Sequence, residues 1–339
     1  MGVRVRSSPD NQSRDKHVES TSVTCLDEGS TPSSSTPESL SYMKQNNIAV
    51  SLSIVYLIAF VAFNIYSYCL MELVTPSWSD QKFLLVRLAL MLFMPVVMTA
   101  VLAFFMSREK HYSGLLLFFT FVTAGVGAIF YPLWLKKREA PHAAQLERYV
   151  MIYSVALAVR FVWPLVAGTH AWSAFFVRND WAAYLPYLYN AVMAYLAVMQ
   201  LREMRCGHWA TWVCFIVLML CSSSLGVLAL VLLYARYGSD YKAPDHLTKY
   251  WVVVAAQQLL LYAWGKVYGM LLKKEVYEVM DMSWLGSAIY DLGLIIVAIF
   301  LIKDVRHTSI KGKAWLILPV FATPIFPIGA LESTNLAEE

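Results

Sequence analysis

The chain has 339 residues, 58% of them hydrophobic, with a mean hydropathy of +0.53 and a formal net charge of +4. So much apolar chain leaves no room for a large soluble catalytic domain. The small positive charge is spread over several segments, with no basic block of the kind that binds nucleic acid, so we expect no nucleic-acid partner. None of the five cysteines forms a C-x-x-C pair, which argues against a disulfide framework and against a zinc site.

The N-terminal segment 1–45 is rich in serine, threonine and proline and contains almost no large apolar residue before Tyr42. Such a segment cannot bury enough apolar surface to offset its ordering entropy, which predicts a disordered tail. No apolar stretch of signal-peptide type follows its early arginines, so we expect no cleaved leader.

Eight long apolar stretches follow the tail. A helix needs about 20 apolar residues to cross the hydrocarbon of a bilayer. Continuous apolar runs of this length predict helices rather than the alternating strands of a barrel. We therefore predict an all-α polytopic transmembrane bundle over 46–333, with a short tail at 334–339. The predicted spans are 48–71, 84–106, 113–135, 150–169, 183–201, 209–235, 250–272 and 284–302.

A ninth apolar segment, 314–331, contains Pro319, Pro324 and Pro327. Because proline interrupts a helix, this segment is predicted to be either a broken ninth helix or a re-entrant element.

The basic residues give a mixed signal for orientation. With eight spans, the N-terminal tail and the loops 236–249 and 303–313 fall on one side of the membrane, but Lys136, Lys137 and Arg138 fall on the other. The positive-inside rule therefore favours a cytosolic N-terminus only weakly.

Asp291 and Arg160 lie near the centres of the eighth and fourth predicted spans. A charge at this depth costs at least ~2.5 kcal/mol on insertion scales, so both side chains are expected to face the bundle interior. One interpretation is a structural ion pair between two helices. The other makes Asp291 a proton donor in a cavity, because an apolar site keeps a carboxylic acid protonated.

Several further residues are candidates for the same site. Glu72 closes the first span and is either an interfacial acid facing the cavity or the polar end of a helix. The predicted catalytic residues are thus Asp291 and Glu72. The residues predicted to bind substrate or to stabilise a cation are Arg160, Tyr187, Asn190, Gln257 and Tyr290. Aromatic rings can stabilise cations through their faces, although core packing explains most membrane aromatics.

Three classes of function remain: an enzyme acting on a lipid-soluble substrate, a transporter or channel for a small molecule, and a non-catalytic scaffold. No histidine cluster, G-x-S-x-G, P-loop or GxGxxG motif occurs, which argues against di-iron, zinc, hydrolase and nucleotide chemistry. There is no convincing internal repeat of the transporter type. Because a scaffold needs no charge within the membrane, the two deep charges favour the enzyme.

The chain resembles the integral-membrane terpene cyclases of fungal meroterpenoid and indole-diterpene clusters, including the paxilline-type membrane proteins. The features that carry the resemblance are the size, the number of spans, the isolated acids Glu72 and Asp291, and the Ser/Thr/Pro-rich tail. It implies an isomerase or lyase of secondary metabolism in the endoplasmic reticulum membrane. Such an enzyme uses no metal or cofactor, and a protonated acid opens the epoxide or alkene of a prenylated, lipophilic isoprenoid substrate. The sequence leaves the substrate, the product and the oligomeric state open.

Overall fold

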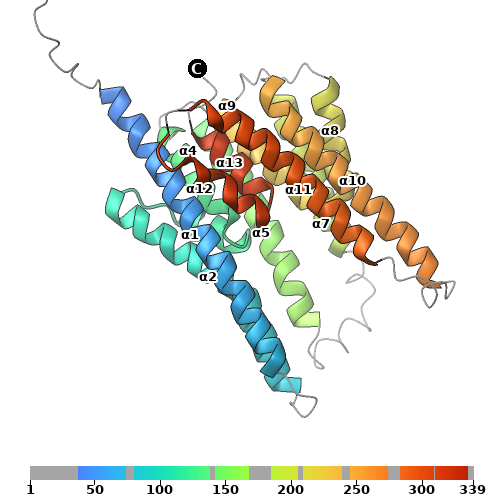
Figure 1. Cartoon of the computed structure of the whole chain (residues 1–339). Coiled ribbons are helices and arrows are strands. Elements are labelled where there is room, and N and C mark those ends of the chain that lie inside the picture. The colour runs from blue at the N-terminus through green and yellow to red at the C-terminus, as the bar shows by residue number, and fades with distance from the viewer. Residues whose placement is uncertain are drawn as a thin grey trace, which may run out of the picture.

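The computed structural model describes residues 37–73, 80–137, 142–167, 185–204, 209–238, 245–273, 283–308 and 310–334. Every regular element in these ranges is a helix, which confirms the predicted all-α class (Figure 1). The predicted disordered tail lies mostly outside the described residues, and α1 begins at Pro37.

Six helices of 19 to 37 residues form the frame of the bundle in the described ranges. Consecutive members pack closely, α1 against α2 and α10 against α11 (Figure 1). Their bounds are α1 Pro37–Leu73, α2 Asp80–Glu109, α5 Ala143–Ala167, α7 Leu185–Glu203, α10 Asp245–Lys273 and α11 Ser283–Arg306.

Three pairs of shorter helices are inserted between the long ones. Each pair enters the bundle, breaks near its middle and turns back, so each is a helical hairpin. The first consists of α3 Gly114–Val122, the 3₁₀ helix η1 Val126–Ile129 and α4 Phe130–Lys137. The second consists of α8 Trp209–Cys221 and α9 Ser223–Tyr237, and the third of α12 Lys313–Ile317, η4 Leu318–Phe321 and α13 Ile325–Ser333.

Contacts at one end of the bundle show that the first hairpin returns to the side from which it starts. Lys44 of α1 forms an ion pair with Glu109 at the end of α2, just before α3 begins. The neighbouring Gln45 donates its Nε2 hydrogen to the carbonyl oxygen of Pro132 in α4, at 3.1 Å. Since both ends of the hairpin meet the first turns of α1, α3 and α4 cannot together form one crossing.

The turn of this hairpin depends on two residues in left-handed conformation, Ala124 (φ 53°) and Gly125 (φ 90°). Such backbone reverses the chain, and glycine adopts it without steric cost. The Gly125 N–H donates to the Thr120 carbonyl at 2.8 Å, and the Thr123 hydroxyl donates to the Phe119 carbonyl at 2.7 Å. The polar backbone groups freed by the break are thereby satisfied within the protein, as a lipid environment requires.

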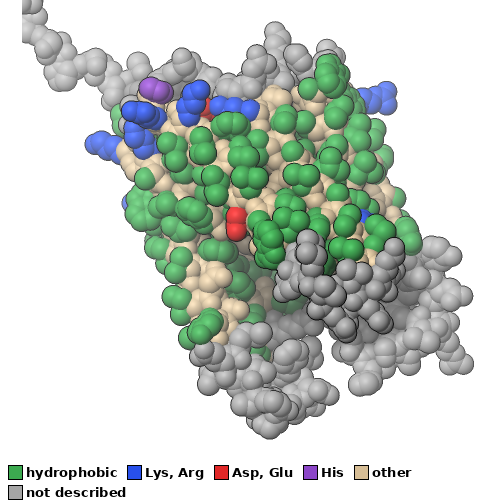
Figure 2. Space-filling model, turned by 45° about the vertical axis from the view of Figure 1, so that its right-hand side comes forward, with side chains coloured by type: hydrophobic (Ala, Val, Ile, Leu, Met, Phe, Trp, Pro, Cys, Tyr) green, Lys and Arg blue, Asp and Glu red, His purple; other side chains and the backbone are tan. Residues whose placement is uncertain are grey.

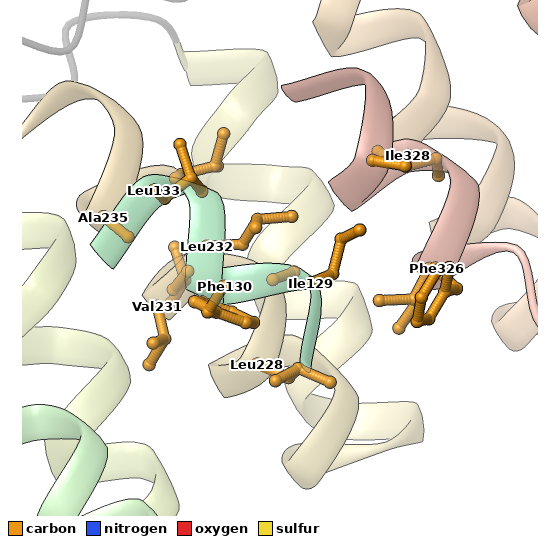
Figure 3. Packing of buried hydrophobic residues seen from close by; sticks show 14 of the residues in the cluster. Ile129, Phe130, Leu133, Leu228, Val231, Leu232, Ala235, Phe326 and Ile328 are labelled. Atoms are coloured by element: carbon orange, nitrogen blue, oxygen red, sulfur yellow. The ribbon is translucent and has the colours of Figure 1, made fainter. Parts of the chain in front are cut away.

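Helix α9 lies at the centre of the bundle, with every residue from Gly226 to Ala235 buried. Figure 3 shows Leu228, Val231 and Leu232 of α9 packed beside Ile129 and Phe130 of the first hairpin and Phe326 of the third. A helix that is apolar on all sides is stable only when it is surrounded. The three hairpins therefore pack together and form the core.

Most of the described basic side chains, though not Arg160 or Lys266, gather at one end, which we call the basic end. Figure 2 shows Lys and Arg along the upper edge of a face that is otherwise mainly hydrophobic. The residues of the basic end are Lys44, Arg108, Lys110, Arg148, Arg202, Arg236, Lys249, Lys303, Arg306, Lys311 and Lys313.

Within the described ranges, three helices are long and apolar enough to cross a membrane: Met43–Leu70, Leu88–Glu109 and Trp284–Arg306. They coincide with the first, second and eighth predicted spans. The predicted spans 113–135 and 209–235 are wrong as single crossings, because each breaks in the middle and reverses. The segment 314–331 is broken into α12, η4 and α13, as its three prolines predict.

The tip of the first hairpin yields a stability prediction. A Cβ atom at Gly125 would lie 2.5 Å from Cγ of Met98 in α2, and the positive φ adds strain. We expect Gly125→Ala to lower the free energy of unfolding by about 1–3 kcal/mol. The control is Gly269→Ala, in helix α10, where a Cβ meets no atom within 4 Å. Thermal unfolding in detergent micelles compares the two variants, and equal melting temperatures would contradict the proposed turn.

Candidate functional site

A cavity of about 1090 Å³ lies between α5, α7 and the break that separates α8 from α9. Most of its wall is aliphatic, with a few polar groups on one side. A pocket of this kind is the usual form of a small-molecule site. The lining residues are Met151, Ile152, Val155, Ala156, Val159, Arg160, Leu188, Tyr189, Asn190, Val192, Ala194, Met219, Leu220, Cys221, Ser222 and Ser223.

The break in the second hairpin places backbone and hydroxyl groups beside the cavity. Ser222 has extended backbone (φ −153°, ψ 90°) and precedes the first turn of α9. Serine favours such positions because its hydroxyl competes with helical hydrogen bonds. The Tyr153 hydroxyl of α5 donates to the carbonyl oxygen of Ser224 at 2.9 Å and fixes the break against the neighbouring helix.

The polar groups of the cavity form two contacting pairs. The Arg160 guanidinium carbon lies 4.8 Å from the centre of the Tyr189 ring, which is a cation–π contact. The Ser223 hydroxyl donates to Oδ1 of Asn190 at 3.1 Å, linking α9 to α7. A ligand with an apolar body and one polar or electron-rich group matches this wall.

Two of the predicted site residues, Arg160 and Asn190, line the cavity. Tyr187 lies on the same helix as Asn190 but is 72% exposed and is not part of the wall. It is therefore not brought together with the other two.

Gln257 and Tyr290 occur together at a different place, between α10 and α11. Gln257 is 3% exposed and donates its Nε2 hydrogen to the Tyr290 carbonyl at 2.7 Å. A Cβ atom at Gly293 would lie 2.6 Å from the Gln257 amide, so this glycine allows the two helices to approach closely. This geometry is that of an interhelical hydrogen bond.

Asp291 and Arg160 do not face the bundle interior as expected, since both side chains are exposed. Within the described residues, the ion pairs are Lys44–Glu109 and Lys249–Asp304, so Asp291 and Arg160 do not pair with each other inside the chain. The reason is placement: Arg160 turns to the cavity beside α7, whereas Asp291 lies on the outer side of α11.

Glu72, the second predicted acid, lies in the last turn of α1, which ends at Leu73. Its side chain lies outside the described residues. The lining residues that the structure describes include no carboxyl group. If a reaction in this cavity needs a protonated carboxylic acid, that acid must come from a residue outside the described wall.

A buried acid that the sequence analysis missed is Glu332, at the end of α13 and 1% exposed. Among the described residues neither carboxyl oxygen has a hydrogen bond of good geometry, and the indole Nε1 of Trp251, also buried, is close enough to stabilise the carboxylate only weakly. Arg236, the nearest cation, donates instead to the Thr334 carbonyl at 3.0 Å. The sequence does contain a signal for this residue: Glu332 is an isolated acid directly after the proline-rich apolar segment. The predicted segment ends at 331, so Glu332 is left out of it.

The environment of Glu332 favours the neutral acid. Desolvation raises its pKa from 4.5 to about 8, while the charge of Arg236 and the Trp251 indole oppose the shift. Glu332 lies at the basic end, outside the three candidate spans. Because the folded state holds this proton more tightly than the unfolded state, its stabilising contribution is complete below pH 4.5 and is lost as the pH rises toward 8.

No protein-family model, curated protein or solved structure matches this chain. The function is therefore argued from the geometry.

Glu332→Gln is expected to remove the pH dependence described above, because the amide is similar in shape but cannot ionise. At about 1.4 kcal/mol per pKa unit, the shift corresponds to a stabilisation of the variant on the order of 5 kcal/mol above pH 8 and to none near pH 4.5. Melting temperatures at both pH values measure this difference. Glu147→Gln, at an exposed position of α5, is the control and should follow the wild type. Parallel curves for Glu332→Gln and the wild type would show that the pKa of Glu332 is the same in the folded and unfolded states, and would contradict the buried site.

Proposed function

We propose that the chain is a multi-pass membrane enzyme that takes a lipophilic, isoprenoid-type substrate into the cavity between α5, α7 and the α8–α9 break. The observation that supports this most is the cavity itself, which has aliphatic walls and one polar side. Its volume of about 1090 Å³ is at the upper end of the range of small-molecule pockets, so a multi-ring or long-chain substrate fits.

The membrane arrangement that we propose has α1, α2, α5, α7, α10 and α11 crossing the bilayer, with the three hairpins entering from the basic end. With eight crossings, Lys136 and Lys137 would lie on the side opposite the other basic segments. Because α3 and α4 form a hairpin, α4 ends at Lys137 on the same side as Lys44, and this disagreement with the positive-inside rule disappears. The positive-inside rule then places the basic end, including the start of α1, in the cytosol. The endoplasmic reticulum is the proposed membrane.

This topology predicts where introduced cysteines react. In sealed microsomes with the cytosolic face outward, a cysteine at Lys110 or Lys311, both exposed at the basic end, should react with a membrane-impermeant maleimide. A cysteine at Trp284, which is exposed at the start of α11, should react only after permeabilisation. Labelling of all three positions in sealed vesicles would contradict the arrangement.

The reaction that we propose is a metal-independent terpene cyclisation started by a protonated acid. The aliphatic wall would keep water from the carbocation, and the Tyr189 ring would present its face to positive charge. Asp291, with Glu72 second, remains the candidate donor, and either must reach the substrate from outside the described wall. The resemblance to the integral-membrane terpene cyclases supports this chemistry.

The activity prediction uses full-length protein in microsomes that are supplied with a prenylated epoxide. Ala194→Phe places a ring in the cavity and is expected to reduce kcat/KM at least about tenfold, equivalent to about 1.4 kcal/mol. Ala256→Phe, exposed on α10 and away from the cavity, is the control and should keep normal turnover. Equal activity of the two variants would place the substrate elsewhere.

The same assay tests the acid. Asp291→Asn keeps the volume of the side chain but cannot protonate an epoxide, so it should preserve expression and abolish product. Glu72→Gln is the second variant. Full turnover by both variants would refute an acid-initiated route through these residues.

A specific observation also favours transport as a second candidate function. Discontinuous helices that meet within the bundle, as α8 and α9 do at Ser222, are typical of transporter binding sites. Solute flux in proteoliposomes that Ala194→Phe blocks, together with no product from the precursor, would favour this candidate.

A further inference from the structure

Asp291, on the outer side of α11, and Arg160, at the cavity between α5 and α7, carry opposite charges in otherwise apolar surroundings. Each is exposed, and neither forms an ion pair with a described residue of its own chain. An ionised group that faces hydrocarbon is unfavourable unless it meets an opposite charge, water or a polar partner. A partner from outside the chain would therefore relieve both sites.

Asp291 and Arg160 lie at similar distances along their helices from polar contacts of the basic end. Asp304, which pairs with Lys249, marks that end on α11, and Asp291 is 13 residues before it, or about 20 Å at 1.5 Å per residue. Gln145, which donates to Glu203, marks the same end on α5, and Arg160 is 15 residues after it, or about 22 Å. Two copies side by side in one bilayer would therefore bring these charges to the same level.

Both charges are embedded in exposed aliphatic stripes. On α11 the exposed residues near Asp291 are Leu292, Ile295 and Ile299, with helical spacing of three and four. On α5 the exposed residues near Arg160 are Met151, Val155 and Val159, spaced by four. Stripes of this kind pack as ridges into grooves when two helices meet.

We infer that the protein self-associates in the membrane through α11 of one copy and the α5–α7 groove of the next, with Asp291 paired to Arg160 of the partner subunit. The contact joins two different surfaces, so it is heterologous and builds a closed ring or a chain. A second copy is the occupant that supplies the complementary charge at the matching depth. The interface does not rest on the proposed function, although it would bring a carboxyl group to the cavity whose described wall has none.

The test uses full-length chains with two different tags, expressed together and solubilised in a mild detergent. Asp291→Arg alone and Arg160→Asp alone should each lower co-purification of the two tags about tenfold, which corresponds to about 1.4 kcal/mol. The double variant Asp291→Arg/Arg160→Asp should restore it, because the charges are exchanged but still complementary. Lys266→Glu, an exposed charge reversal on α10, is the control and should associate like the wild type.

A second measurement avoids the charged residues and any effect of their replacement on folding. Val159→Cys in one tagged chain and Leu292→Cys in the other should form a disulfide between the chains under mild oxidation in native membranes. Val159→Cys paired with Val252→Cys, exposed on α10, is the matched control and should not. Absence of the first cross-link, or failure of the double charge exchange to restore association, would overturn the interface. Because both readouts report assembly, they are independent of turnover.

Discussion

Three chain breaks lie inside this bundle, and the need to satisfy their backbone groups governs its architecture. Hydrocarbon offers no hydrogen-bond partner, so an interrupted helix is tolerated only where protein surrounds the interruption. At the first break, the Gly125 N–H and the Thr123 hydroxyl cover the carbonyls that end α3. At the second, the Ser222 N–H donates to the Leu218 carbonyl at 2.7 Å and the Gly226 N–H donates to the Ser222 carbonyl at 3.0 Å. The long helices form the wall that encloses these breaks.

The convergence of the hairpins explains why α9 is buried along ten successive residues. Ile129 and Leu232 both contact the position of Gly329, where a Cβ atom would lie 3.1 Å from one and 3.4 Å from the other. The backbone of α13 therefore approaches α9 and η1 closely. The same enclosure places Glu332, at the end of α13, in a site from which water is excluded.

The charged groups of the chain fall into two populations with different energetics. At the basic end, cations lie beside carboxylates and carbonyl ends of helices, as in the short contact between Lys249 and Asp304 at 2.7 Å. Arg160 and Asp291 lie far along apolar helices, and in the proposed membrane arrangement a lone charge there is costly because the dielectric is low. A cation–π contact with Tyr189 partly compensates Arg160, but Asp291 has no described counterpart within the chain. This difference is the physical reason to look for a partner outside the chain.

The amino-acid sequence by itself determined the helical class and the long apolar helices α1, α2 and α11; it also named Arg160 and Asn190, which the structure places at the cavity, as site candidates. Length and apolarity are local properties, so a sliding window along the chain detects them. Tertiary structure alone decided that 113–135 and 209–235 turn back, because two half-length helices contain as many apolar residues as one crossing. It also decided that Asp291 is exposed and that Glu332 is buried. The burial of a charged residue depends on which other helices surround it, and the spacing of residues along one helix carries no information about those helices.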